Sequence, residues 1–174
     1  MRGAQMRSMG ERGFGMCGIV GAVGLATCGD ILLDALKRLE YRGYDSAGIV
    51  TYNGSAFETA RSVGKLANLD ALMRTKPLSG TIGIGHTRWA THGGVSEANA
   101  HPHTASDRVV IVHNGIIENH RQLRQRLEQN GHVFSSDTDS EVLAHLFVEA
   151  FDSGLSPSEA TRTVVAAIEG TYAF

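Results

Sequence analysis

Cys17-Gly-Ile-Val-Gly-Ala-Val-Gly24 is the stretch that decides the fold of this chain. The run is apolar, compatible with β structure and punctuated by glycines, a combination that predicts a buried strand. Residues 1–16, which precede it, are rich in Met, Gly and Arg and have no periodicity. We therefore expect the folded domain to occupy residues 17–174, with residues 1–16 as a leader or a mis-assigned start.

Helical and strand patterns are mixed in the residues that follow. Apolar residues recur at helical spacing from Ile31 to Leu39, and Gly43 comes after the last turn as a stop signal. Asn53-Gly54 is a hairpin signal. The remaining patterns predict strands at 48–52, 56–60, 81–86 and 109–113, and helices at 65–73, 119–130, 138–151 and 157–169. Without a regular βαβ rhythm, this mixture indicates an α+β fold.

The last two expected helices carry further signals. Thr138 precedes Glu141 by three residues and Ser156 precedes Glu159 by three, so each helix is expected to open with a capping box. A run of β character then begins at residue 170 and stops at residue 174. We expect the domain to be truncated there, with sheet edges left unpaired.

Size and composition narrow the possible functions. The chain has 174 residues, 42% of them hydrophobic, which is enough for one globular domain with its own core. A net charge of −2, without a basic excess, argues against a nucleic-acid partner. No apolar stretch is long enough to span a bilayer. The chain has only two cysteines, which fits a reducing compartment, so a cytoplasmic location is expected.

Cys17 is the residue with the clearest chemical potential. It directly follows Met16, so translation starting at Met16, or removal of the leader, would make it the amino-terminal residue. A free α-amine has a pKa of roughly 7.7–8 and can act as a base for the thiol of the same residue. The structural alternative is a small buried residue in a strand, which is how we interpret Cys28.

Polar clusters lie where apolar runs end, and three of them suggest ligand binding. Arg88 follows a strand and could clamp a carboxylate. Asp139, at a helix start, could accept from an ammonium group. Asn114 and Gly115 offer a side-chain amide and a backbone N–H, which together could form an oxyanion hole. Taken alone, each cluster also fits a turn or a surface contact.

Six ordered motifs resemble one known family. They are Cys17-Gly-Ile-Val-Gly21, Leu39-Glu-Tyr-Arg-Gly-Tyr-Asp-Ser-Ala-Gly48, Gly85-His-Thr-Arg-Trp-Ala-Thr-His-Gly93, Asn99-Ala-His-Pro-His103, His113-Asn-Gly-Ile-Ile-Glu-Asn119 and Ser136-Asp-Thr-Asp-Ser-Glu141. Their order and content are similar to the glutaminase domain of the glutamine:fructose-6-phosphate amidotransferases, from Cys17 to the last residue. The resemblance implies a four-layer αββα sandwich of the amino-terminal nucleophile hydrolase type, here incomplete at its carboxyl-terminal end.

The resemblance also implies a mechanism. Cys17 attacks the side-chain amide of glutamine, its α-amine manages the proton, and water resolves the resulting thioester. Asn114 and Gly115 stabilise the oxyanion, while Arg88 holds the glutamine carboxylate and Asp139 its ammonium group. The remaining residues implied by the family are Thr91 and His92 in the pocket, Trp89 on the ammonia path, and Arg42 and Gly43 in a loop around the nucleophile.

The same resemblance sets the expected partners. Ammonia would pass to a separate carboxyl-terminal half that binds fructose 6-phosphate and makes glucosamine 6-phosphate, and the parent protein would be a homodimer. Neither a cofactor nor a metal is implied, and no nucleic acid or membrane is expected as a partner.

Three alternatives stay open at this point. Amidophosphoribosyltransferases and asparagine synthetases share the domain, although Trp89-Ala-Thr-His-Gly93 favours the sugar phosphate enzymes. A metal-binding module could use His101-Pro102-His103, but no Cys or Glu stands at ligand spacing. Finally, a blocked Cys17 would leave an inert or interaction domain that keeps only the fold.

Overall fold

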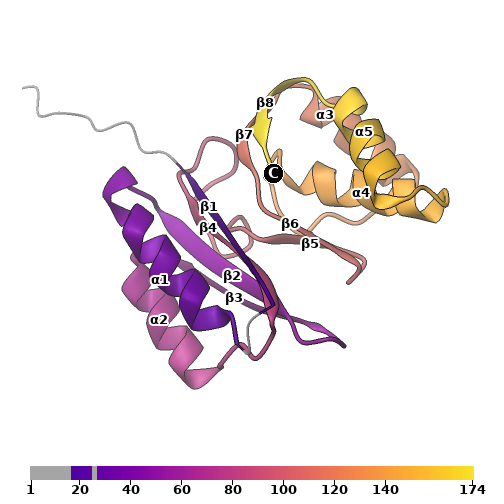
Figure 1. The fold of residues 1–174 in the computed structure, drawn as a ribbon. Coiled ribbons are helices and arrows are strands. Elements are labelled where there is room, and N and C mark those ends of the chain that lie inside the picture. Colours follow the sequence, from indigo (N-terminus) through magenta and orange to yellow (C-terminus); the bar gives the residue numbers. More distant parts are fainter. Residues whose placement is uncertain (1–16, 25–26) are drawn as a thin grey trace, which may run out of the picture.

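Two helix-covered β structures face each other in this protein. The computed structural model describes residues 17–24 and 27–174 (Figure 1). The predicted leader, residues 1–16, lies outside the described residues. Within the described ranges, no helix has both the length and the apolar character needed to cross a membrane.

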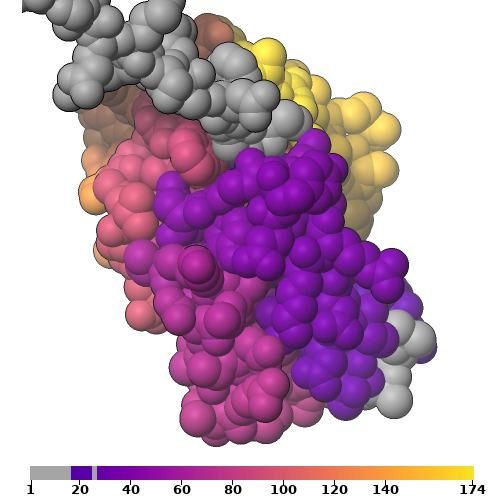
Figure 2. Space-filling view, turned by 90° about the vertical axis from the view of Figure 1, so that its left-hand side faces the viewer, coloured from indigo at the N-terminus to yellow at the C-terminus, as the bar shows by residue number. Residues whose placement is uncertain are grey.

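The first half is a four-stranded antiparallel sheet in the order β1-β4-β2-β3. Its strands are β1 (Gly18–Val23), β2 (Ser46–Tyr52), β3 (Phe57–Val63) and β4 (Ile82–Arg88). One face is covered by α1 (Gly29–Leu39), which leads into the short 3-10 helix η1 (Glu40–Arg42), and by α2 (Leu66–Thr75). Figure 2 shows these helices forming the outer surface of this half. The apolar stripes of the helices and the sheet together bury a core that includes Leu32, Leu36, Ile49 and Leu69.

The second half contains two-stranded ladders and three helices. Its strands are β5 (His103–Ala105), β6 (Val109–Ile111), β7 (Asn114–Ile117) and β8 (Gly170–Ala173), paired as β5-β6 and β7-β8. Its helices are α3 (His120–Gln129), α4 (Glu141–Asp152) and α5 (Pro157–Ala167). A second core joins them, and α4 supplies much of it through Val142, Leu143, Leu146 and Val148.

The layers run from α1 and α2 through the four-stranded sheet and the second set of strands to α4 and α5 (Figure 1). This order is the predicted α+β sandwich. The layers meet closely at Gly48 in β2, where a Cβ atom would lie 2.2 Å from the carbonyl oxygen of His101. Only glycine at this position lets the backbone of β2 come so close to the backbone at His101.

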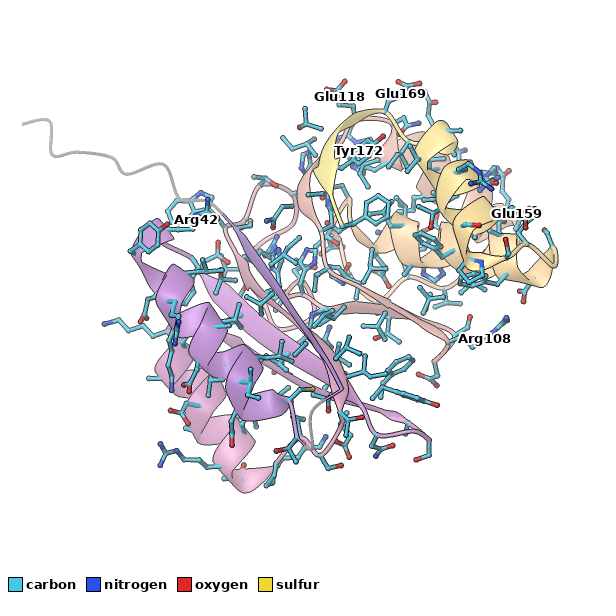
Figure 3. All side chains as sticks on the ribbon, viewed as in Figure 1. Arg42, Arg108, Glu118, Glu159, Glu169 and Tyr172 are labelled. Carbon is cyan, nitrogen blue, oxygen red and sulfur yellow. The ribbon has the colours of Figure 1, made fainter. Side chains whose placement is uncertain are left out.

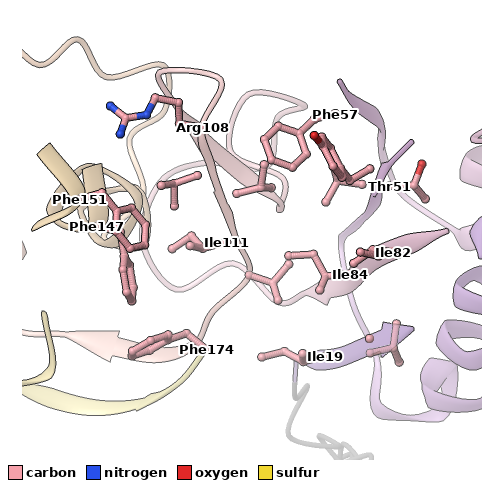
Figure 4. Close-up of a pocket in the computed structure, with 18 residues that line it drawn as sticks. Ile19, Thr51, Phe57, Ile82, Ile84, Arg108, Ile111, Phe147, Phe151 and Phe174 are labelled. Atoms are coloured by element: carbon pink, nitrogen blue, oxygen red, sulfur yellow. The ribbon is translucent and has the colours of Figure 1, made fainter. Parts of the chain in front are cut away.

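Elsewhere an apolar cavity of about 590 Å³ separates the two halves (Figure 4). Ile19 and Ile84 line it from the sheet, and Ile111, Phe147 and Phe174 line it from the second half. The prediction that β1 is a buried strand was therefore wrong. Among the described strands β1 pairs only with β4, and its inner face borders this open space, so most of its residues are only partly covered.

Two short strands were not predicted. β5 and β7 have three and four residues and contain His103, Thr104, Asn114 and Gly115, so they lack the apolar alternation that marks a strand. The strand expected at 109–113 is also shorter and ends at Ile111. The other predicted helices and strands are present with boundaries shifted by a few residues, and the Asn53-Gly54 hairpin joins β2 to β3.

One predicted capping box is present and the other is not. Ser156 and Glu159 form theirs at the start of α5. The box expected from Thr138 was wrong, because α4 begins at Glu141 after Ser140, which makes no side-chain cap. The Glu141 carboxylate instead accepts hydrogen bonds from the backbone N–H and hydroxyl groups of Ser135 and Ser136.

This arrangement predicts a pH-dependent contribution of Glu141 to stability. Burial alone would raise the pKa of this carboxyl group, but the nearby His145 ring and the hydrogen bonds from Ser136 and Ser135 hold it well below its ordinary value. With a lowered folded pKa, the stabilisation is complete above the unfolded pKa of about 4.3 and is lost as the pH falls below it.

We expect Glu141→Gln to reduce the free energy of unfolding by about 3 kcal/mol at pH 7, since the buried serine donors lose a charged acceptor. Urea unfolding at several pH values measures this difference. It should narrow below about pH 4. A difference that stays constant from pH 7 to pH 3 would contradict the assignment. Glu128→Gln, on the exposed side of α3, is the matched control and should change stability by less than about 0.5 kcal/mol.

Candidate active site

A pocket of about 240 Å³ lies where the ends of β1 and β4 meet the second half. Of the ten residues proposed for the site from the sequence, the structure brings seven to its wall: Cys17, Arg88, Trp89, Thr91, His92, Gly115 and Asp139. Asn114 adjoins the pocket through a hydrogen bond from its Nδ2 to the Cys17 carbonyl oxygen, at 3.3 Å. Arg42 and Gly43 do not line the pocket. Arg42 ends η1 and is labelled in Figure 3, and Gly43 follows with a φ of 76°.

Cys17 is placed by the pairing of β1 with β4. Gly18 lies opposite Thr87, so the residue before the strand reaches the backbone just beyond β4. There the Trp89 N–H donates a hydrogen bond to the Cys17 Sγ at 3.2 Å. Burial raises the pKa of the Cys17 thiol, and the Trp89 N–H and the Arg88 charge offset part of that increase. The thiol is thus protonated at neutral pH, and its use as a nucleophile needs a base.

Four buried histidines in or beside the pocket are poor candidates for that base. Burial lowers the pKa of His86 to about 4 and that of His103 to about 3, and it also lowers the pKa values of His101 and His113. These rings are neutral and weakly basic near pH 7. Among the described residues, the hydrogen bonds of the Cys17 side chain are with Trp89 alone. The site therefore differs from a cysteine–histidine dyad.

Asn114 and Gly115 open strand β7. The Asn114 Oδ1 lies 2.8 Å from the His86 Nε2, while its Nδ2 faces the Cys17 carbonyl. Gly115 has a φ of 131°, and a Cβ atom there would lie 1.9 Å from the Thr171 carbonyl oxygen of β8. A side chain at this position is therefore excluded both by the backbone conformation and by the neighbouring strand.

Arg88 ends β4 with its side chain buried. Its guanidinium group donates to the carbonyl oxygens of His92, Gly93 and Gly94, which fixes the loop after β4. At least two of its five N–H donors remain without a hydrogen-bond acceptor among the described residues. Arg88 supplies positive charge to the pocket wall.

Asp139 supplies the opposite charge. Its side chain is buried, lines the pocket, and accepts a hydrogen bond from the Ile117 N–H at 2.8 Å through Oδ2. No described residue hydrogen-bonds to its Oδ1. A guanidinium and a carboxylate thus line the same small pocket as a thiol, an arrangement complementary to an amino acid zwitterion.

Two residues of the site were missed when candidates were chosen from the sequence. The Asp45 carboxylate accepts from the Ala90 N–H at 2.5 Å and lies 4.0 Å from the Arg88 guanidinium, so it braces the loop that carries Trp89. His86 contacts Asn114 from β4. Both lie inside motifs that carried the resemblance, and each is a polar residue within or beside an apolar strand, which was the available signal.

The histidines raise the question of a metal. The rings of His101 and His103 lie with their centroids 4.4 Å apart and are both buried. In residues 17–24 and 27–174, no three His, Cys, Asp or Glu side chains form a group that could hold a metal ion. His103 instead shares a hydrogen bond with the Thr138 hydroxyl at 2.9 Å.

Comparison with known proteins identifies the family. Residues 73–174, more than half of the chain, match the family model of the glutamine amidotransferase domain. The chain belongs to this family.

Two curated relatives of this chain share one name, glutamine–fructose-6-phosphate aminotransferase (isomerizing). The chain is 54% identical over 158 residues to the glutamine–fructose-6-phosphate aminotransferase (isomerizing) of Mesorhizobium japonicum, and 51% identical over 159 residues to that of Thermus thermophilus. Each alignment covers 91% of this chain and 26% of the relative. The chain thus spans about a quarter of the length of these relatives.

Solved structures support the same class of fold. Glutamine phosphoribosylpyrophosphate amidotransferase from B. subtilis matches 88% of this chain and 33% of its own chain, with a TM-score of 0.75 and 26% identity. A second structure, described as the allosteric regulatory enzyme of purine biosynthesis, matches 89% of this chain and 34% of its own, with a TM-score of 0.77 and 29% identity. The predicted α+β sandwich of amidotransferase type is confirmed.

Proposed function

We propose that this chain is the glutamine-hydrolysing part of an enzyme that transfers the amide nitrogen of glutamine to fructose 6-phosphate. The observation that carries the proposal is the pocket of about 240 Å³, in which the Cys17 thiol shares a wall with the Arg88 guanidinium and the Asp139 carboxylate. Under this proposal Arg88 binds the α-carboxylate of glutamine and Asp139 its α-ammonium group, with Thr91 and His92 beside them.

The proposed chemistry begins at Cys17. Its sulfur forms a bond to the side-chain carbonyl carbon of glutamine, and the thiol proton passes to the α-amine of the same residue. Asn114 Nδ2 and the Gly115 N–H stabilise the negative oxygen of the tetrahedral intermediate. The carbon–nitrogen bond then breaks, the α-amine returns the proton to the leaving nitrogen, and ammonia departs. Water hydrolyses the thioester to glutamate and regenerates the thiol.

This chemistry requires a free α-amine on Cys17. We propose that residues 1–16 are a leader that is removed or an upstream start that is not used, and that residues 17–174 are the amidotransferase part. A thiol with a raised pKa gives the requirement a physical reason, because the proton needs an acceptor close to the sulfur. Trp89 is proposed to seal the path that ammonia takes, and Arg42 and Gly43 to support the loop near the nucleophile.

The acceptor of the ammonia is inferred from the curated relatives. They are named as fructose-6-phosphate aminotransferases and are 50–54% identical to this chain, whereas the phosphoribosylpyrophosphate enzyme is 26% identical. We therefore propose fructose 6-phosphate as the acceptor, bound by a part of the protein beyond these residues, with glucosamine 6-phosphate as product. A homodimeric protein in the cytoplasm, where thiols stay reduced, completes the proposal.

Labelling with a glutamine analogue that carries an electrophilic diazoketone tests the proposal. The protein is expressed from its own gene, incubated with the analogue and digested, and the labelled peptide is identified by mass. We expect the label on a peptide that begins at Cys17, together with glutamine-dependent formation of glucosamine 6-phosphate from fructose 6-phosphate. An unlabelled peptide with residues 1–16 still attached would refute the nucleophile, and product formation with another acceptor would refute the assigned sugar.

A further inference from the structure

We propose that His86 is a positioning residue that fixes the orientation of the Asn114 side-chain amide and keeps its NH₂ group on the Cys17 side. The inference rests on the proposed function, in which that NH₂ group stabilises the oxyanion. It concerns a residue that touches Asn114 and acts on the reaction only through it.

The protonation state of His86 follows from its two contacts. Its Nε2 lies 3.0 Å from the His113 carbonyl oxygen and 2.8 Å from the Asn114 side chain. A backbone carbonyl can only accept, so Nε2 must carry the proton. The Asn114 atom that faces Nε2 must then also be an acceptor, which makes it the amide oxygen. The NH₂ group is left to point the other way, toward the Cys17 carbonyl at 3.3 Å.

The surroundings of His86 keep its ring in this state. The side chain is fully buried in β4, and its ring stacks on that of His101 with centroids 4.2 Å apart. Its Nδ1 is buried and has no hydrogen-bond partner, so no described group competes to place the proton there. Burial lowers the pKa of His86 to about 4, and the ring is therefore neutral at physiological pH.

Without this donor, the long 3.3 Å hydrogen bond from Nδ2 to the Cys17 carbonyl oxygen would be the one described hydrogen bond of the side chain left to favour this orientation of the Asn114 amide. A flip by 180° would bring the amide oxygen toward the Cys17 carbonyl, where it would repel rather than stabilise a developing oxyanion. Because His86 holds the amide in place before substrate binds, no free energy is spent on reorienting it during the reaction. The effect should appear in kcat for glutamine hydrolysis and hardly in KM, because the oxyanion exists only after attack.

Kinetics of three single variants in the protein expressed from its own gene test the proposal first. We expect His86→Leu to lower kcat about 100-fold with KM for glutamine within about threefold, which is the loss typical of one oxyanion-hole donor. His86→Gln retains an N–H donor at a similar distance and should recover most of the loss. His145→Leu, which removes a buried ring of α4 outside the pocket, should leave kcat within about twofold.

The decisive comparison uses Asn114→Ala as background. If His86 acts through Asn114, adding His86→Leu to that background should lower kcat by less than about threefold. Full multiplication of the two single losses would overturn the proposal, because it would show that His86 acts independently of Asn114.

A spectroscopic readout separates this proposal from the proposed function. Long-range ¹H–¹⁵N spectra of the histidine rings report which nitrogen of His86 carries the proton. We expect Nε2 at pH 7, and a proton on Nδ1 would overturn the positioning role whether or not the protein hydrolyses glutamine. Conversely, an Nε2–H ring in a protein with no Cys17-dependent glutaminase would refute the proposed function and leave the orientation of Asn114 as inferred.

Discussion

Replacing Cys17 with serine is expected to reduce the rate of glutamine hydrolysis by at least about a thousandfold. The variant keeps the shape of the side chain and an O–H donor, but a hydroxyl is a far weaker nucleophile than a thiol, and its higher pKa makes its proton harder to transfer to the α-amine. Release of glutamate and of ammonia, each measured at saturating glutamine, provides the test. Residual hydrolysis within tenfold of the unmodified protein would place the nucleophile elsewhere.

Cys28→Ser is the matched control for this prediction. Cys28 is buried at the start of α1, and its S–H donates to the Gly80 carbonyl oxygen at 3.1 Å, a bond that a hydroxyl can also make. Because Cys28 does not line the pocket, kcat should stay within about twofold, with at most a small loss of thermal stability. The pair thus compares the same substitution inside and outside the proposed site.

Asp139→Asn is expected to raise KM for glutamine roughly 100-fold, which is a second large effect after that of Cys17→Ser. The amide can still accept from the Ile117 N–H, so the local backbone contact is kept while the negative charge is lost. The remaining pocket would then present Arg88 to a substrate whose ammonium group has no counter-ion. Steady-state kinetics over a wide range of glutamine concentration measure the change.

A truncated substrate makes this test specific. 4-Carbamoylbutanoate lacks the α-ammonium group, so the charge of Asp139 has nothing to pair with. We expect the unmodified protein and Asp139→Asn to bind this analogue equally well within about threefold. Asp152→Asn, at an exposed position paired with Arg108, should leave KM for glutamine unchanged. Equal losses for glutamine and the analogue would mean that Asp139 serves the fold of the pocket instead of the ammonium group.

Most of the architecture could be predicted because its signals are local. The stripe from Ile31 to Leu39, the Asn53-Gly54 turn and the Ser156 cap each depend on contacts within a few residues, and each is present in the structure. β5 and β7 could not be found this way. They exist because other parts of the chain pair with them, β6 with β5 and β8 with β7. No pattern within strands of three or four residues records that pairing.

The site likewise has features that the sequence predicts and features that depend on three-dimensional packing. Its members were proposed from motifs, and the structure brings Cys17, Arg88 and Asp139 to one pocket although they are far apart in the sequence. Their roles stay predictions. The turn of Glu141 toward Ser135 and Ser136 was read wrongly as a cap of α4, because the spacing of Thr138 and Glu141 satisfies the local rule while the three-dimensional packing offers better donors.

The pairing of β1 with β4 has a consequence for synthesis of the protein. Gly18 of β1 lies beside Thr87 of β4. β4 begins at Ile82, 64 residues after β1 begins at Gly18, so it is translated later. At roughly 5 to 20 residues per second, the ribosome needs several seconds to make the partner. During that interval Cys17 has no sheet to join, so an enzyme that trims the nascent chain would meet an open backbone. The nucleophile is thus the first residue of the site to be made, and its strand stays unpaired until β4 has been synthesised.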